Sequence, residues 1–249
     1  MVAIRLKREF LHVTLDVMDP KTFEEKVRLL LPLFEMDAHG GEPGCTDDVC
    51  ATVGPVAQAG ASGFRWRHIL AGRRQLEDKR AQFVHLWRVP SPPNLGTAMH
   101  ILATDRDYAD LHDTVVAETQ ELAHLERAYS PNTLDYSAQD ASGCLLREVF
   151  ELKPSRRSVA KYQMRMRLEV TREMQKRHGW RLLVAIQHVT GRLGTRVNFW
   201  WAPKESLAGA RRDFECLELN NTTATGDTRT IDVFEIVDYR ARENALAAE

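Results

Sequence analysis

The sequence predicts an α+β protein in which two βαββαβ units follow one another along the chain. Three observations predict it: short residue groups recur in the same order in both halves, apolar residues alternate as in strands, and other segments carry apolar residues at helical spacing. We therefore expect a first unit over 1–141, with an insertion at 37–62, and a second unit over 142–249.

The repeat is clearest at two tryptophans, Trp87 and Trp200, each followed three residues later by a proline and then by a Leu–Gly–Ala grouping. The other matching groups are Arg8-Glu9-Phe10 with Arg147-Glu148-Val149-Phe150, Gly63-Phe64-Arg65 with Gly179-Trp180-Arg181, Gly72-Arg73 with Gly191-Arg192, and Thr133-Leu134-Asp135 with Thr230-Ile231-Asp232. Because all pairs keep their order, we interpret the chain as a tandem duplication.

The first half begins with a strand over 10–17 that leads into a helix. Asp19 is a suitable N-cap and Pro20 suits the first helical position, and the following apolar residues keep helical spacing. The remaining elements predicted for this half are a hairpin of 64–71 with 82–89, a helix over 108–125 and a last strand over 133–137.

The second half repeats this order. A strand over 145–152 precedes a helix that ends at His178-Gly179, with glycine as the C′ residue. The later elements predicted here are a hairpin of 181–190 with 195–202, a short helix over 207–217 and a last strand over 231–239. The order βαββαβ is that of the ferredoxin-like fold.

Three segments resemble NIPSNAP domains, which belong to the dimeric α/β-barrel superfamily. They are VHLWRVPS and TDRDYADL in the first half and REVFELKPSRRSVAKY in the second. The resemblance implies that two ferredoxin-like units pair their sheets around a cavity, and two copies in one chain imply an intramolecular pseudo-dimer. The second copy would bury the apolar sheet face that the helices of the first leave bare.

The composition limits the kinds of partner and bound group that we expect. A formal net charge of -1 gives no electrostatic reason to expect nucleic acid or an anionic membrane, and no apolar run approaches the ~20 residues of a membrane span. Four cysteines do not make a disulfide framework, so we expect a reduced, cytoplasmic protein. Cys45 and Cys50 lack the second pair that zinc sites show, and the chain has no nucleotide-binding motif; we expect neither a metal nor a cofactor.

Strand alternation selects the candidate catalytic residues. His85 and Trp87 share one strand face, and Asn198 and Trp200 share a face of the matching strand. One hypothesis is a cavity for an aromatic molecule, lined by both tryptophans, in which His85 or His12 acts as general acid and base and Asn198 stabilises an enolate. The alternative is that His85 is a hydrogen-bonded core residue and that both tryptophans only pack.

Four further residues are candidates for binding the substrate. Arg65 and Arg67 alternate with aromatic residues and would clamp a carboxylate, although solvent-exposed arginines fit the pattern as well. His188 near a strand end and Tyr239 on the last predicted strand would line the cavity, or are ordinary strand residues. The glycine-rich insertion 37–62 has no aromatic residue and is either a lid over the cavity or disordered.

The resemblance and these residues together favour a small-molecule enzyme of natural-product metabolism. It would be a cofactor-independent cyclase, isomerase or monooxygenase that acts on an aromatic or polyketide-like substrate. Two alternatives stay open: a NIPSNAP-like binding or adaptor protein without catalysis, and a haem-binding barrel with a histidine as axial ligand. The expected partner is a small molecule, and the sequence leaves open whether the chain forms a homodimer.

Overall fold

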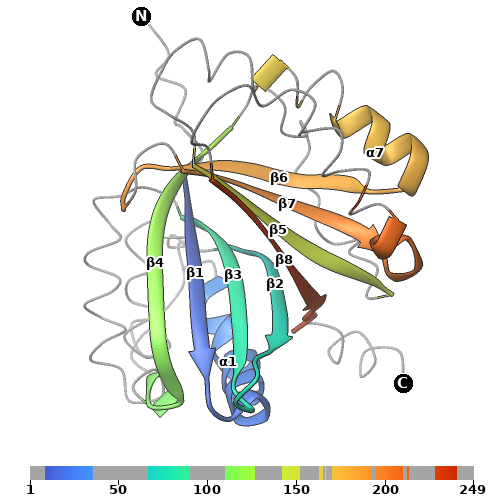
Figure 1. Ribbon diagram of the computed structural model, residues 1–249. Helices are drawn as coiled ribbons and strands as arrows, with labels where there is room; N and C mark the ends of the chain where they lie inside the picture. Colours follow the sequence, from blue (N-terminus) through green and yellow to red (C-terminus); the bar gives the residue numbers. More distant parts are fainter. Residues whose placement is uncertain are drawn as a thin grey trace, which may run out of the picture. The chain divides into compact units, whose positions relative to one another are not determined.

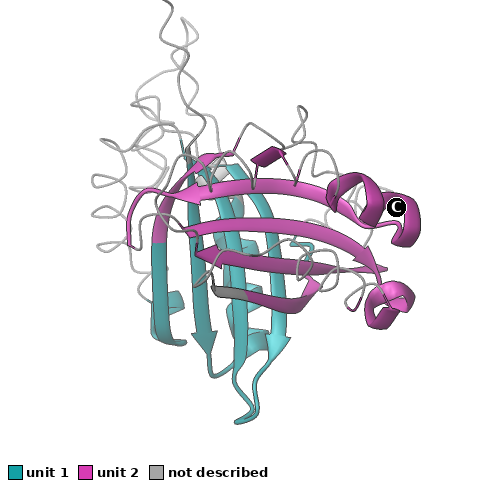
Figure 2. Ribbon diagram, turned by 45° about the horizontal axis from the view of Figure 1, so that its top comes forward, with its two compact units in different colours: residues 1–120, 237–249 teal, residues 121–236 magenta. Residues whose placement is uncertain are grey.

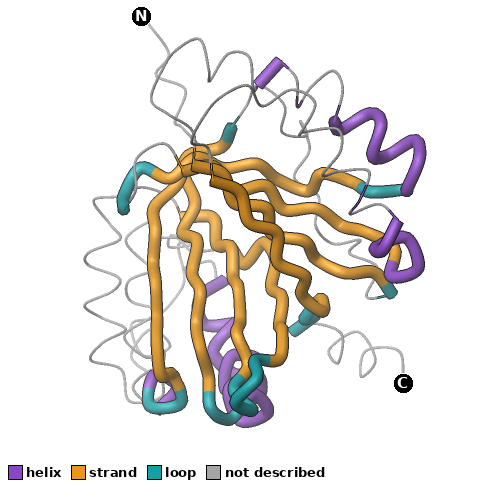
Figure 3. Tube along the Cα trace, in the orientation of Figure 1, coloured by secondary structure: helices purple, strands orange, loops and turns teal. Residues whose placement is uncertain are grey.

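The computed structural model describes residues 9–35, 67–89, 110–126, 142–151, 163–164, 166, 170–191, 195–209, 212 and 228–239. The insertion 37–62 and the predicted strand 133–137 lie outside this part of the chain. Within it, long strands make up most of the structure and helices are few, as Figure 3 shows. None of the helices in the described ranges is long and apolar enough to cross a membrane.

The chain divides into two compact units, coloured separately in Figure 2. Unit 1 consists of residues 1–120 together with the C-terminal residues 237–249, and unit 2 consists of residues 121–236. The division thus falls inside a strand, and the chain returns to unit 1 at its end. The expected boundary between 141 and 142 stays a prediction.

Unit 1 contains an antiparallel sheet with the strand order β1-β3-β2. Its strands are β1 (Glu9–Val17), β2 (Arg67–Gln75) and β3 (Ala81–Val89), and β4 (Val115–Leu125) begins in this unit. The hairpin between β2 and β3 was expected from the alternation of apolar residues, and it is confirmed, with β2 lying a few residues later than predicted.

Helix α1 (Pro20–Glu35) covers one face of this sheet and begins where the sequence predicts. The carboxylate of Asp19 accepts hydrogen bonds from the amide of Thr22 at 3.1 Å and from its hydroxyl at 2.7 Å, which is N-capping. Phe23 on the buried face of α1 lies 4.7 Å from Phe83 of β3, measured between ring centroids. The face of β3 that carries Phe83 is therefore the helix-covered face.

Unit 2 contains an antiparallel sheet with the order β8-β5-β7-β6, and the end of β4 pairs with β6 (Figure 1). The elements are β5 (Gly143–Glu151), α7 (Thr171–His178), β6 (Arg181–His188), β7 (Thr195–Pro203), the 3-10 turn η2 (Lys204–Ser206) and β8 (Thr228–Ile236). The first and third strands of the unit are central, as in a ferredoxin-like sheet.

The core of unit 2 lies between α7 and the sheet. Trp200 of β7 is fully buried, with its ring 6.4 Å from that of Trp180, and Met174 of α7 packs in the same cluster. Gly179 ends α7 in the left-handed conformation, at φ 69°, as the sequence predicts. The face of β7 that carries Trp200 is therefore covered by α7.

The helix predicted over 108–125 is wrong beyond its first residues. Residues 110–112 are helical, but β4 occupies Val115–Leu125. Ala123 pairs with His188 of β6, and the amide of Met18 donates to the carbonyl of Thr114 at the end of β1. The apolar residues of this half-buried strand of 11 residues happen to fall at helical spacing. The pairings with distant strands stabilise the strand more than that spacing favours a helix.

The two tryptophans occupy matching positions in their own sheets. Trp87 lies opposite His68 of β2, and the β2–β3 register shifts immediately after that residue. Trp200 lies opposite Leu182 of β6, and the β6–β7 register shifts at the same point. This agreement supports a duplication, which stays a prediction, as does the pseudo-dimer.

Two of the matches read from the sequence are wrong. Val13 lies opposite His85 in unit 1, and Glu148 lies opposite Asn198 in unit 2, so Val13 rather than Glu9 takes the place of Glu148. Gly72 is inside β2, whereas Gly191 follows β6, so these glycines do not correspond either. Strand pairing sets the register, so short groups of similar residues in the two halves do not always occupy equivalent positions.

Candidate functional site

His85 lies in the middle of β3, on the helix-covered face of unit 1. It is 2% exposed, and the ring of Phe23 from α1 meets it edge-on with 6.1 Å between centroids. Its cross-strand neighbours are Val13 and Ala71. The structure thus places His85 between the sheet and its own helix, and not on the bare sheet face at which the cavity was expected.

Tyr239 is the hydrogen-bonding partner of His85. Its hydroxyl oxygen lies 3.3 Å from His85 Nε2, and the two rings stack with 5.7 Å between centroids and 19° between planes. Tyr239 was expected on the last strand, but β8 ends at Ile236, and the residue belongs to the segment that returns to unit 1. Both residues were therefore candidates from the sequence, but the contact between them was not predicted.

His68 and Trp87 complete an aromatic cluster around the pair. The His68 ring lies 5.6 Å from the rings of both His85 and Tyr239, and 4.8 Å from that of Trp87. All four side chains are buried. The rings of His85 and Trp87 stack with 6.3 Å between centroids, which confirms their expected shared face. His68 was not among the residues selected from the sequence, because only the register of the hairpin places it opposite Trp87.

Burial decides the protonation of the pair. Desolvation lowers the pKa of His85 to about 3, so the imidazole is neutral at neutral pH. Burial, together with the Glu24 carboxylate, raises the pKa of the Tyr239 hydroxyl well above its ordinary value. When the imidazole proton is on Nδ1, the phenol donates to Nε2, so the pair is a neutral donor and a neutral acceptor.

Asn198 in unit 2 holds a buried carboxylate. Its Nδ2 donates to Glu148 Oε2 at 3.0 Å, and Nε1 of Trp200 donates to the same oxygen at 3.0 Å. All three residues are 0% exposed, beneath α7. The amide expected to stabilise an enolate is thus engaged with Glu148, a residue that sequence analysis did not select as a candidate because its place opposite Asn198 depends on strand pairing.

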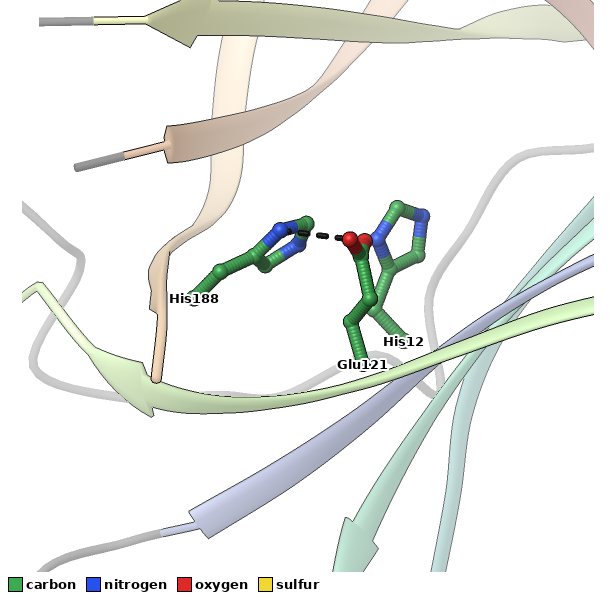
Figure 4. Close-up of side chains that lie close together, drawn as sticks. All are labelled: His12, Glu121 and His188. Atoms are coloured by element: carbon green, nitrogen blue, oxygen red, sulfur yellow. Dashed lines mark ion pairs between the residues drawn. The ribbon is translucent and has the colours of Figure 1, made fainter. Parts of the chain in front are cut away.

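A second polar group in unit 2 lies on the opposite face of β6. His188 follows the helix-facing Ala185 by three residues, and alternation turns it to the other side of the sheet. Its Nδ1 lies 3.0 Å from Oε2 of Glu121 in β4 (Figure 4); the imidazole is 3% exposed and the carboxylate side chain 29%. Glu121 was missed because the segment around it was expected to be helical.

The turn after β6 determines the place of that carboxylate. The amide of Val189 donates to the carbonyl of Leu122 at 2.8 Å, and the amide of Leu122 donates to Oγ1 of Thr190 at 2.8 Å. Gly191 follows at φ 68°, and a Cβ on it would lie 2.8 Å from Oε1 of Glu121. The backbone conformation therefore favours glycine here, and a Cβ would force the end of the Glu121 side chain to move.

The remaining candidates are His12, Arg67 and Arg65. His12 in β1 is buried opposite Leu86, on the sheet face opposite to that of His85. Arg67 is exposed at the start of β2, and Arg65 lies outside the described residues. His85 and Asn198 thus belong to different units, each with partners of its own.

Comparison with known proteins supports the fold class. No protein-family model matches the sequence, and no curated protein is significantly similar to it. Among solved structures, an anthrone oxidase-like protein has a TM-score of 0.52 at 9% identity, covering 93% of this chain and 92% of that chain. A haem-binding protein from Thermus thermophilus has a TM-score of 0.50 at 10% identity, covering 97% of this chain and 96% of that one.

A mutant chlorite dismutase from Candidatus Nitrospira defluvii also has a TM-score of 0.50, at 8% identity, with 97% of this chain and 96% of that chain covered. These neighbours have the ferredoxin-like fold of dimeric α/β-barrel proteins. At such low identity the likeness is one of fold alone. The NIPSNAP resemblance stays a prediction.

Proposed function

We propose that this chain is a small-molecule enzyme that removes a proton from an aromatic or polyketide-like carbon acid, with His188 as the general base. Glu121 would orient the imidazole. This is chemistry of the cofactor-independent monooxygenases, isomerases and cyclases. The observation that carries the proposal is the 3.0 Å distance between the buried imidazole Nδ1 and the partly exposed carboxylate Oε2.

A carboxylate beside an imidazole does two things. It holds the ring in one orientation, and it stabilises the imidazolium that forms when the ring takes up a proton. Nδ1 lies against Glu121, and the imidazole would receive the substrate proton. The partial exposure of Glu121 connects the pair to solvent, through which the proton is exchanged.

The surroundings of His188 suit an aromatic substrate. Ile186 and Val184 precede it on the same face of β6, and they lie opposite Val197 and Phe199 of β7. All four are fully buried. An apolar strip beside a polar pair is what an aromatic ring with one acidic C–H group requires.

His85 is less suited to be the base. An imidazole with a pKa of about 3 is a weak base at neutral pH, and its Nε2 already faces the Tyr239 hydroxyl. Asn198 is held by Glu148 and is not part of the proposed site. We therefore place the proton transfer at His188 rather than at the pair that the sequence predicts.

Anthrone is a suitable probe, because its methylene group lies between two aromatic rings and is acidic. Without oxygen, proton removal is measured as deuterium exchange of the methylene in D2O by NMR. With oxygen, the carbanion gives its electron pair to O2; one oxygen atom becomes the new carbonyl and the other leaves as water. Each anthrone then consumes one O2 and yields one anthraquinone, followed with an oxygen electrode and by absorbance.

His188→Asn should slow the exchange by about 100-fold or more, and Glu121→Gln by less, because the base remains but loses its orientation. The chain offers a matched control in the exposed pair of His112 and Glu118, which are 2.9 Å apart. His112→Asn should leave the rate unchanged. Exchange as fast in His188→Asn as in the wild type, or no faster in the wild type than in buffer, would overturn the proposal.

The same assay separates the other classes. Exchange without oxygen uptake supports an isomerase or cyclase, and anthrone binding without exchange supports the non-catalytic alternative. Haem does not fit His85 as arranged, because ligation through Nε2 would require Tyr239 to leave. The absorption spectrum of the purified protein tests haem binding directly.

A further inference from the structure

The C-terminal segment 237–239 contacts unit 1 through a backbone hydrogen bond and through a buried side chain. The amide of Val237 donates to the carbonyl of Ala71 in β2 at 3.1 Å. Asp238 is exposed, but Tyr239 is only 4% exposed. The segment is irregular, so the Tyr239 side chain is its anchor.

The anchor fits a site built by the sheet. The Tyr239 ring stacks on His85 and meets His68 edge-on, with 5.6 Å between centroids and 62° between planes. Trp87 meets His68 edge-on with 4.8 Å between centroids and stacks on His85 with 6.3 Å between centroids. The hydroxyl at the end of the ring reaches Nε2 of His85. A site that binds a phenol needs aromatic side chains against the ring and one hydrogen-bond acceptor for the hydroxyl, and both are present here.

We propose that His68, His85 and Trp87 form a phenol-binding site, that Tyr239 occupies it in this structure, and that a free phenolic molecule takes the same place and releases the C-terminal segment. The site is separate from the one proposed for proton transfer at His188, and it does not depend on that function.

The chemistry of the site selects an uncharged hydroxyl. The imidazole of His85 is buried and neutral, so it accepts a hydrogen bond without attracting an ion. A carboxylate or an ammonium group would lose its hydration in this site without gaining an opposite charge from the ring. An aromatic hydrocarbon would fill the space but leave Nε2 without its donor.

Tyr239 competes with any free phenol, because it is tethered. A short linker keeps the tyrosine at an effective concentration of about millimolar or above. The wild-type site should therefore bind a phenol only weakly, whereas removal of the Tyr239 side chain should open it.

The experiment uses p-cresol, which is the tyrosine side chain as a free molecule, and toluene, which lacks the hydroxyl. Tyr239→Ala should bind p-cresol at least about tenfold more tightly than the wild type does, because the tethered competitor is gone. It should prefer p-cresol to toluene by about three- to tenfold, the usual effect of one neutral hydrogen bond. Titration calorimetry measures both.

Two variants serve as controls. Tyr239→Phe keeps the ring in the site but loses the hydroxyl, so its affinity for p-cresol should lie between those of the wild type and Tyr239→Ala. Tyr239→Ala combined with His85→Leu keeps the space and removes the acceptor, so the preference for p-cresol over toluene should disappear. Equal binding of p-cresol and toluene by folded Tyr239→Ala, or binding of neither, would overturn the proposal.

A measurement on the unaltered protein decides the question if Tyr239→Ala does not fold. The Val237 amide is bonded to Ala71, so its hydrogen exchange reports release of the segment. Saturating p-cresol should accelerate this exchange, and benzoate at the same concentration should not. Unchanged exchange of Val237 in saturating p-cresol contradicts the displacement.

Discussion

β3 of unit 1 and β7 of unit 2 place different chemistry at the same position. His85 and Asn198 each precede a tryptophan by two residues, and each lies opposite an alanine of the next strand, Ala71 or Ala185. Yet His85 is surrounded by aromatic rings, whereas Asn198 donates to a fully buried carboxylate. Equal backbone positions therefore do not imply equal functions.

The difference comes from the first strand of each unit. Val13 lies opposite His85, and Glu148 lies opposite Asn198. Val13 is apolar, so His85 bonds instead with the Tyr239 hydroxyl from the C-terminal segment. The Glu148 carboxylate accepts hydrogen bonds from the amide of Asn198 and the indole of Trp200. The cross-strand neighbour, more than the position itself, decides what a buried polar residue does.

Removing Glu148 should have the largest effect on the free energy of unfolding, and it tests this comparison directly. Glu148→Ala leaves Nδ2 of Asn198 and Nε1 of Trp200 without their acceptor in a dry site, and should lower the free energy of unfolding by about 3 kcal/mol or more. Val13→Ala removes the matching residue of unit 1 and leaves only a cavity, at about 2 kcal/mol. Urea denaturation measures both; equal losses would show that the polar network adds nothing.

Giving unit 1 the asparagine of unit 2 sharpens the comparison, because it changes how stability depends on pH. Burial lowers the pKa of His85 from 6.5 to about 3, so in this interval the unfolded chain binds a proton that the folded chain does not. The stability contributed by the neutral imidazole is complete above pH 6.5 and is lost as the pH falls toward 3. The contribution of His85 has a slope of at most about 1.4 kcal/mol per pH unit.

His85→Asn gives unit 1 the residue that unit 2 carries at this position, and asparagine does not titrate. The free energy of unfolding of this variant should fall less steeply with decreasing pH than that of the wild type, while the slopes should agree above pH 7. Denaturation curves at several pH values provide the measurement. Parallel curves throughout would mean that His85 takes up its proton equally in the folded and unfolded chain.

Two glycines of unit 2 provide the test with the smallest expected effect on stability. Gly179 and Gly191 have almost the same conformation, at φ 69° and 68°, so alanine should cost each about 1 kcal/mol of backbone strain. A Cβ at Gly179 would make only an ordinary 3.5 Å contact with Pro203, whereas at Gly191 it would displace the Glu121 carboxylate. Gly191→Ala should therefore reduce anthrone exchange, and Gly179→Ala should not.

If both glycine variants lost anthrone exchange, backbone strain alone would explain the loss. Combining Gly191→Ala with Glu121→Asp refines the test, because the shorter side chain leaves room for the added methyl group. The two changes should then cost less together than the sum of their separate effects on the rate.

Local signals in the sequence predicted much of the fold. Asp19 and Pro20 place the start of α1, and Gly179 places the end of α7, because capping depends on a few neighbouring residues. Alternation of apolar residues predicted β3 and β7 and the shared face of His85 and Trp87. It failed at β4, whose spacing fits a helix equally well and whose pairing with β6 is not local.

The candidate sites were predicted only in part. His85, Asn198, His188 and Tyr239 were selected, but His68, Glu148 and Glu121 were not, although each contacts at least one of them. These partners lie on other strands, and the register that brings them together depends on turns and bulges between distant segments.

The sequence by itself determined the helix caps, the strand alternation and the presence of two sets of strands, because each depends on residues close together along the chain. Only the tertiary structure decided which sheet face a helix covers, and that Tyr239 contacts a histidine 154 positions away. Such contacts follow from the burial of apolar faces and the pairing of strands, which depend on the whole of each unit and cannot be derived from local spacing.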